Sequence, residues 1–151
     1  YFLNSRFRPI LDMRKSGKDI IQDRTIYEDA FIFAPNLHAM GLMTNRDFEN
    51  YRSLFDLMES VTKPPDLLIY LRSTVPNLVN QIQKRGREYE NSISIDYLNR
   101  LNERYEAWIH DYNKGNLLII DIDKFNFVDN PEDLGDIINK IDAELNGLFK
   151  S

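Results

Sequence analysis

Apolar residues recur along this 151-residue chain in two alternating patterns. In the longer pattern they stand three or four positions apart, which is the spacing of one face of an α-helix. This pattern predicts helices over residues 1–16, 26–40, 44–62, 73–85, 94–112 and 130–148. In the shorter pattern a few residues with an apolar centre stand together, which is typical of a strand buried on both faces. These runs predict strands over residues 19–23, 67–71 and 117–121.

Local signals mark where several of these helices begin and end. Thr44, followed three residues later by Asp47, has the form of a capping box in which aspartate replaces glutamate. Ser94 is expected to cap the helix that follows it, and Pro131 suits the first turn of the last helix. Gly17 suits the position just after the first helix, because glycine accepts the left-handed conformation there. The helix over residues 26–40 is expected to break near its proline.

The alternation of apolar strands with helices predicts an α/β fold with a parallel sheet, in a single domain over residues 1–151. In such sheets ligands bind at the carboxyl ends of the strands. The three predicted strands carry charge at those ends, in Asp23-Arg24, Leu71-Arg72 and Asp121-Ile122-Asp123. Charged groups are therefore expected to gather at the edge where a ligand binds.

Composition and charge exclude several classes of function. The net charge of −5 argues against a protein that binds nucleic-acid polymers or membrane surfaces with its whole surface. The chain has no cysteine, so disulfides and zinc–thiolate sites are excluded. No apolar run reaches the roughly 18 residues of a membrane span, and no signal peptide is recognisable. Because the chain starts with Tyr1 inside a predicted helix, we expect that an upstream segment has been removed.

One charged stretch, Lys84-Arg85-Gly86-Arg87-Glu88-Tyr89-Glu90, allows two interpretations. Arginine side chains match phosphate oxygens in pairs, so the two arginines could clamp a phosphate chain. The same residues could instead form a solvated helix end whose charges pair along the helix. Spacing alone favours the helix end, and only the context of the rest of the chain shifts the balance towards phosphate binding.

Three segments, in this order, resemble the deoxynucleoside kinases, which phosphorylate the 5′-hydroxyl of deoxynucleosides. They are Asp-Arg-Thr-Ile-Tyr-Glu-Asp-Ala-Phe-Ile-Phe at 23–33, Pro-Asp-Leu-Leu-Ile-Tyr-Leu-Arg at 65–72, and Arg-Gly-Arg-Glu-Tyr-Glu at 85–90, which is followed by Tyr97-Leu98 and Leu101. They look like the family's Glu-Arg-Ser segment with its helix, a family strand, and the lid with the helix after it. The Asp-Arg-Thr variant resembles the bacterial branch, which is commonly assigned deoxyadenosine or related purine deoxynucleoside kinase activity.

The resemblance implies roles for four residues around the acceptor. Arg24 looks like the arginine that orients the substrate 5′-oxygen and supports phosphoryl transfer. Asp23 stands where the family has a glutamate that helps to hold Mg²⁺, and its side chain is one methylene shorter. Asp29 matches a carboxylate that reads the edge of the base, and Glu90 matches the glutamate that accepts the sugar 3′-hydroxyl.

On the ATP side, the resemblance implies a lid over residues 83–91 whose Arg85 and Arg87 close on the phosphates. The loop that begins at Asp121 looks like the one whose backbone holds the adenine of ATP. Within that loop Asp123 and Phe127 are the candidate cofactor-binding residues, and Phe127 is better suited to packing than to specific recognition.

The implied fold is a three-layer P-loop kinase-like fold with a parallel sheet, lacking its first two strands, including the P-loop strand. None of the six glycines begins the pattern Gly-x-x-x-x-Gly-Lys-Ser/Thr that cradles phosphates. The chain therefore looks like the C-terminal three-quarters of a kinase, and by itself it is expected to bind nucleotide poorly and to lack turnover. The strands at 19–23 and 67–71 should then be about 10 Å apart, with a missing strand between them, or the sheet should be rearranged. Direct hydrogen bonding between these two strands would contradict this placement.

The sequence thus predicts a deoxynucleoside kinase that uses ATP and Mg²⁺ and acts on a purine deoxynucleoside, most plausibly deoxyadenosine. The resemblance further implies a cytoplasmic homodimer, in which the family pairs through the helix after Arg24 and the helix with the aromatic residues Tyr97, Tyr105, Trp108 and Tyr112. No nucleic-acid polymer or membrane is expected as a partner. Two alternatives stay open: a nucleoside-monophosphate kinase of the same fold, and a non-catalytic nucleotide-binding or scaffold domain.

Overall fold

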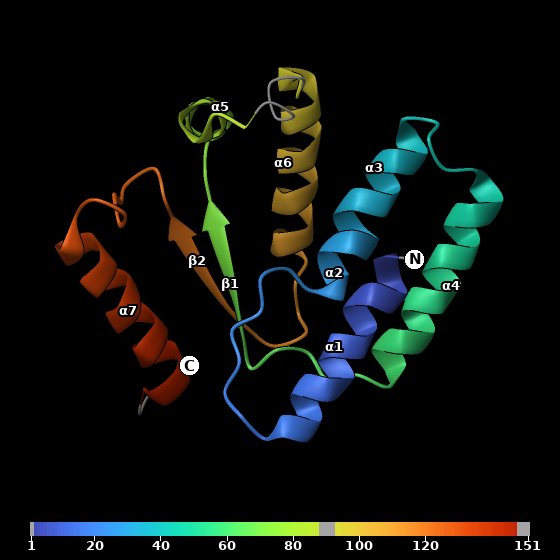
Figure 1. Cartoon of the computed structure of the whole chain (residues 1–151), viewed down its shortest axis with the longest axis horizontal. Helices are drawn as coiled ribbons and strands as arrows, with labels where there is room; N and C mark the ends of the chain where they lie inside the picture. The colour runs from blue at the N-terminus through green and yellow to red at the C-terminus, as the bar shows by residue number, and fades with distance from the viewer. Residues whose placement is uncertain (1, 88–92, 148–151) are drawn as a thin grey trace. The chain divides into compact units, whose positions relative to one another are not determined.

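The computed structural model describes residues 2–87 and 93–147, and its elements follow the predicted order with one exception (Figure 1). The α-helices are α1 (Phe2–Ser16), α2 (Ile26–Glu28), α3 (Ala34–Ala39), α4 (Asn45–Ser60), α5 (Val75–Arg85), α6 (Ile95–His110) and α7 (Pro131–Asn146), and the strands are β1 (Leu67–Arg72) and β2 (Asn116–Asp121). A π-helical turn, η1 (Asp29–Phe33), joins α2 to α3. Among these residues, no helix combines the length and the apolar character that crossing a membrane requires.

The predicted helix boundaries are confirmed by their caps. Thr44 accepts a hydrogen bond from the Asp47 backbone N–H, with 3.1 Å between the nitrogen and Oγ1. Ser94 Oγ accepts the Tyr97 N–H in the same way, also at 3.1 Å. Gly17 has a φ of +63°, the left-handed conformation that its place after α1 required.

The contacts of the chain divide it into two compact units. Unit 1 is built from the residues up to Lys63 together with Glu103–Trp108, and unit 2 from Pro64–Asn102 together with the residues from Ile109 onward. The single domain over residues 1–151 stays a prediction. Each unit is described separately below.

The core of unit 1 forms where α2, η1 and α4 meet the Glu103–Trp108 part of α6. Its buried residues are Ile26, Tyr27, Ala30, Phe55 and Met58, with Phe7, Ile10, Tyr51 and Trp108 packed around them. The Tyr27 ring lies 6.5 Å from the Trp108 ring and 6.0 Å from the Phe55 ring, centroid to centroid. Trp108 therefore belongs to core packing, and the Tyr105 ring lies 6.3 Å from the Trp108 ring, centroid to centroid.

The turn η1 explains how this helix accommodates its proline. The Ala34 N–H bonds to the Asp29 carbonyl five residues earlier, so the turn before Pro35 is wider than an α-helical turn. In a regular helix the Pro35 ring would collide with the carbonyl four residues before it, and a wider turn relieves that collision. The predicted break near Pro35 is thus a change of helical register in an otherwise continuous helix.

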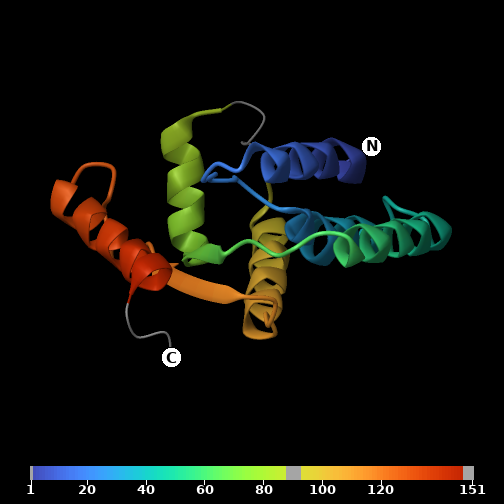
Figure 2. The same ribbon diagram turned by 90° about the horizontal axis from the view of Figure 1, so that it is seen from below.

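In unit 2 the two strands form a parallel pair, as predicted. The register runs from Leu67 opposite Asn116 to Arg72 opposite Asp121. A parallel pair needs a long crossover connection, and the segment with α5 and α6 supplies it. The helix α7 packs against β2 in both views (Figures 1 and 2).

The predicted strand over residues 19–23 is wrong. Residues 19–22 have no regular secondary structure, and the Ile20 and Ile21 side chains are exposed. A strand persists only where its backbone groups find a neighbouring strand. The sheet in the described part of the chain consists of β1 and β2, so residues 19–23 have no such neighbour. No hydrogen bonding joins residues 20–22 to residues 69–71 among the described pairings, and the predicted gap between them stays a prediction.

Candidate functional site

In unit 1 the chain turns at Arg24, the first predicted catalytic residue. Its φ is +64°, and no other non-glycine residue in the described ranges has a positive φ. Such a conformation costs a residue with a side chain on the order of 1 kcal/mol, and it is found preferentially at functional sites. The Arg24 guanidinium lies over the Phe33 ring, with 5.1 Å between its central carbon and the ring centroid, in a cation–π contact. The conformation and this contact together fix the direction in which Arg24 points.

The helix that follows is anchored at once by a reciprocal capping box. Thr25 Oγ1 accepts the Tyr27 N–H at 3.1 Å, while the Glu28 carboxylate accepts the Thr25 N–H at 2.7 Å. The Thr25 hydroxyl donates a further short bond to the same carboxylate oxygen. Because α2 begins directly after Arg24, this box holds the turn in place.

Asp29 lies one residue further along and is buried, with 8% of its surface exposed. Two tyrosines share its surroundings. Burial raises the pKa of the Tyr51 phenol above its ordinary value, and the negative charge of Asp29 raises it further. Burial also raises the pKa of Tyr105 to about 12; Glu28, Asp29 and Asp23 add to this rise, and Arg24 opposes it. Both phenols are therefore neutral hydrogen-bond donors at neutral pH.

Unit 1 thus brings together the predicted residues Asp23, Arg24 and Asp29, and it adds two that the sequence reasoning missed. Tyr105 was recognised only as one member of an aromatic stripe, and Tyr51 only as one apolar position of α4. Their distinguishing feature is proximity to the charged residues of another helix, which periodicity does not reveal. The one signal in the sequence was the tyrosine side chain itself, because its phenol hydroxyl needs a hydrogen-bond partner when the ring is buried.

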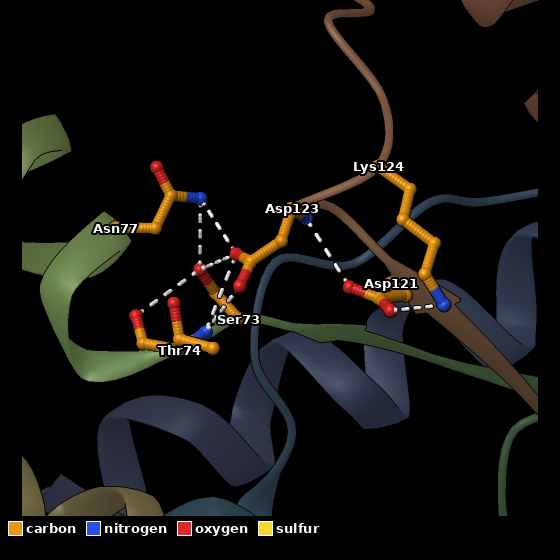
Figure 3. A network of polar contacts seen from close by, with 6 residues as sticks. All are labelled: Ser73, Thr74, Asn77, Asp121, Asp123 and Lys124. Atoms are coloured by element: carbon orange, nitrogen blue, oxygen red, sulfur yellow. Dashed lines mark hydrogen bonds and ion pairs between the residues drawn. The ribbon is translucent and has the colours of Figure 1, made fainter.

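In unit 2 the strand ends meet in a polar network around Asp123 (Figure 3). The Asp123 carboxylate accepts hydrogen bonds from Ser73 Oγ at 2.7 Å, Asn77 Nδ2 at 2.7 Å and the Thr74 backbone N–H at 3.0 Å. The bond from the Ser73 hydroxyl is the main reason why the pKa of Asp123 falls to about 2, and the bonds from Thr74 and Asn77 contribute. The charged residues predicted at the ends of β1 and β2 do therefore lie at one edge.

Beside this network, Asp121 makes two contacts of its own. Its Oδ1 accepts the Asp123 N–H at 3.3 Å, and its Oδ2 pairs with Lys124 Nζ at 2.8 Å. These contacts stabilise the turn that follows β2. Phe127, further along the same connection, is half-buried.

The basic stretch lies at the far end of α5. The helix ends at Gly86, whose φ is +63° and whose N–H bonds to the carbonyls of Ile82 and Gln83. Lys84 and Arg85 occupy the last turn, and Arg87 follows the cap; all three are exposed. Cations are favoured at this end of a helix by its dipole, so the helix-end interpretation and the phosphate interpretation both fit this placement. Glu90 lies outside the described residues, as does part of the predicted lid.

The predicted residues are therefore divided between the units. Asp23, Arg24 and Asp29 lie in unit 1, whereas Arg85, Arg87, Asp123 and Phe127 lie in unit 2. Within the described ranges no group of three or more histidines and acids is arranged to hold a metal ion.

Comparison with known proteins links residues 1–146 to one protein family. The profile of the family described as "Deoxynucleoside kinase" matches residues 1–146. A deoxyadenosine/deoxycytidine kinase of Bacillus subtilis is 37% identical over 146 residues, which cover 93% of this chain and 66% of that protein. A deoxyguanosine kinase of Lactobacillus johnsonii is 35% identical, over 99% of this chain and 70% of that protein. The chain thus spans about two thirds of the length of these relatives.

Solved structures agree with the sequence matches. A deoxyadenosine kinase of M. mycoides with the products dCMP and a flexible dCDP bound superposes with a TM-score of 0.77 at 26% identity, over 95% of this chain and 71% of that one. A second structure of deoxyadenosine kinase from M. mycoides, with dATP bound, superposes with a TM-score of 0.72 at 24% identity and supports the fold. The expected kinase-like α/β fold with a parallel sheet is confirmed by these neighbours.

Proposed function

Since the chain belongs to the deoxynucleoside kinase family, whose members are ATP-dependent phosphotransferases, we propose that the protein transfers the γ-phosphate of ATP to the 5′-hydroxyl of a deoxynucleoside. We take a purine deoxynucleoside as the acceptor, and deoxyadenosine first. The names of the relatives support this choice, because deoxyadenosine and deoxyguanosine recur among them.

The observation that carries the proposal is the conformation of Arg24. A strained backbone, with a capping box directly after it, and a cation–π contact with Phe33 hold the Arg24 guanidinium in one position. Phosphoryl transfer is catalysed mainly by positioning and by cations that stabilise the charge of the transition state. We assign Arg24 that role, with its forked donors directed at the 5′-oxygen and the transferred phosphoryl group.

Asp29 and its neighbours support an uncharged acceptor. A buried carboxylate beside the neutral phenols of Tyr51 and Tyr105 offers hydrogen bonds of both kinds, as recognition of a base edge requires. A nucleoside monophosphate would place a second anion near these acids. This arrangement therefore favours a deoxynucleoside over a monophosphate as the acceptor.

The residues present fit the Mg²⁺ that ATP-dependent transfer uses. Mg²⁺ takes one or two protein carboxylates and completes its octahedral shell with phosphate oxygens and water. The exposed Asp23 carboxylate would supply one such ligand. The bound ion would neutralise charge on the phosphates, and Asp23 would orient it beside Arg24.

We assign the donor side to unit 2. Arg85 and Arg87 would bind phosphate oxygens of ATP, and the connection with Asp123 and Phe127 would hold its adenine. Glu90 would accept the sugar 3′-hydroxyl. Because the 151 residues contain no P-loop pattern, we expect little nucleotide binding and no turnover from this chain alone.

We also propose a homodimer that works in the cytoplasm, where ATP is plentiful, with no nucleic-acid polymer or membrane as a partner. The family resemblance supports the dimer. Sedimentation of the full-length protein would test the oligomeric state, and a monomer at micromolar concentration would contradict it.

The decisive experiment measures phosphotransfer from ATP to deoxyadenosine, deoxyguanosine, deoxycytidine and thymidine by the full-length protein. We expect turnover with a purine preference. In the variant Arg24→Gln, kcat should fall by about 10²- to 10³-fold while the KM of the deoxynucleoside changes only a few-fold, because the lost contact belongs to the transition state. Arg52→Gln, which removes an exposed arginine of α4 in the same unit, serves as the matched control and should keep its turnover.

Three outcomes would contradict the proposal. Absence of transfer to all four acceptors would favour a non-catalytic domain. Faster transfer to a deoxynucleoside monophosphate would favour the monophosphate kinase. Equal kcat values for the Arg24 and Arg52 variants would remove Arg24 from the mechanism.

A further inference from the structure

The Asp123 carboxylate binds three donors that all come from the short segment between β1 and the first turn of α5. We infer that Asp123 is a positioning residue: it fixes the start of α5 and thereby sets where the cations at the other end of that helix lie. The inference rests on the proposed function, because it explains how the cations that would bind ATP are held in position.

The helix α5 needs such an anchor, because its own sequence provides little. Thr74 is the N-cap residue, yet its side chain makes no capping hydrogen bond. Pro76, in the first turn, has no N–H to be capped. None of the side chains of α5 is buried, so packing alone holds this helix weakly. A carboxylate at the N-terminus satisfies both the Thr74 N–H and the positive end of the helix dipole.

The anchor is a tertiary contact, since Asp123 is 49 residues away from Thr74 in the sequence. It joins the segment after β2 to the segment after β1, at the edge where the two strands end (Figure 3). A local cap could be lost and re-formed as the helix moves. A contact of this kind instead ties the helix to the sheet.

The chemistry of the network requires a carboxylate. Ser73 Oγ–H, the Thr74 N–H and the Asn77 Nδ2–H all donate, so the central group must accept from each of them. Asn77 Nδ2 also donates to Ser73 Oγ at 3.0 Å, which leaves the Ser73 hydroxyl proton for Asp123. An asparagine at position 123 would have a single acceptor oxygen, and its NH₂ group would face a donor. The isosteric change Asp123→Asn therefore breaks the network without changing its size.

The effect of the anchor reaches the basic stretch through the helix itself. The 11 residues of α5 rise by roughly 16 Å, and Lys84 and Arg85 occupy the last turn. A helix transmits a tilt at one end to the other, so a small rotation at Thr74 displaces these cations. Arg24 and Asp29, in contrast, belong to unit 1 and gain nothing from the anchor. Loss of the anchor should consequently disturb the binding of ATP through the cations of α5, and it should leave the contact of Asp29 with the base unchanged.

The test compares wild-type full-length protein with Asp123→Asn, Ser73→Ala and the double variant. Asp136→Asn is the matched control, because it neutralises an exposed acid of α7, outside the connection that would hold the adenine. We expect Asp123→Asn to raise the KM of ATP about three- to tenfold, with a smaller rise in the KM of the deoxynucleoside, because only its 3′-hydroxyl contact with Glu90 follows α5. Ser73→Ala should give a smaller change of the same kind. The double variant should be little worse than Asp123→Asn, because both residues belong to one network.

A second measurement is independent of catalysis. Amide hydrogen exchange in the first turn of α5 should become at least about tenfold faster in Asp123→Asn and remain unchanged in Asp136→Asn. Unchanged exchange and unchanged kinetics would overturn the inference. An equal rise in both KM values would also overturn it, because it would indicate general loss of structure. If the wild-type protein transferred no phosphate, the proposed function would fail, while the exchange result would still decide whether Asp123 anchors α5.

Discussion

Two short segments of this chain look alike in sequence and differ in structure. Residues 19–23 and β1 both have an apolar centre, and both are followed or ended by an arginine. β1 is a strand with Leu68 buried at 7% exposure, whereas residues 19–22 have no regular structure and Ile21 is fully exposed at 102%. The difference lies in the neighbour. β1 is paired with β2 along its whole length, and residues 19–23 are paired with no strand of the described chain.

The comparison also separates the two arginines. The Arg72 carbonyl accepts the Ile122 N–H at 2.9 Å, so its backbone continues the ladder, and its guanidinium lies 5.9 Å from the Tyr70 ring centroid. Arg24 has no ladder, and its position is set by the start of α2 and by Phe33. A sheet therefore places the charged residues of unit 2, while a capped helix places those of unit 1.

The largest effect is expected from removing apolar volume at the paired strands. Ile120 of β2 is 1% exposed, and Ile120→Ala should lower the free energy of unfolding by about 2 to 4 kcal/mol, from lost burial and the cavity left behind. Urea unfolding of the 151-residue chain measures this change. Ile119→Ala, on the opposite face and 39% exposed, is the matched control and should cost less than about 1.5 kcal/mol. Equal losses would mean that the pairing of β1 with β2 does not create a one-sided core.

A smaller effect is expected from acid at the strand ends. The pKa of Asp123 is about 2, below the value of about 3.9 for an aspartate in an unfolded chain. Its network therefore stabilises the fold above roughly pH 4, and this contribution is lost as the pH falls towards 2. Urea midpoints of wild type and Asp123→Asn should converge over that range. In Ser73→Ala the main cause of the lowered pKa is gone, so a wild-type acid dependence in that variant would contradict the assignment.

What the sequence could predict follows from the same contrast. The caps at Thr44 and Ser94 and the left-handed Gly17 are local signals, and each was predictable because the residues that make it are neighbours. The predictions of β1 and β2 are confirmed because each strand finds its partner inside the chain. The wrong prediction at residues 19–23 shows the limit of this pattern. An apolar run indicates that a segment can form a strand, but it does not show whether a partner strand is present.

The candidate site shows the same limit at the level of side chains. Arg24 and Asp29 were found through their motif, which is contiguous in sequence. Tyr105 joins them only because α6 returns to unit 1, and Asp123 meets Thr74 across 49 residues. Tyr105 was identified from the aromatic positions of its helix and Asp123 from its place at a strand end, in both cases without the partner residues. Their roles in the site depend on tertiary contacts that no local pattern encodes.

The smallest effect tests the comparison most directly. Ile21→Ala removes as many atoms as Ile120→Ala, yet the fully exposed side chain of Ile21 buries nothing that could be lost. The change in the free energy of unfolding of the 151-residue chain should stay within about 0.5 kcal/mol. Amides of residues 20–22 should likewise exchange much faster than the amides of β1 that donate to β2, because only the latter are hydrogen-bonded in a ladder. A loss above about 1 kcal/mol would place Ile21 in a packed sheet. In that case the difference between the two segments would vanish, and the position of Arg24 would have to be explained by a strand end after all.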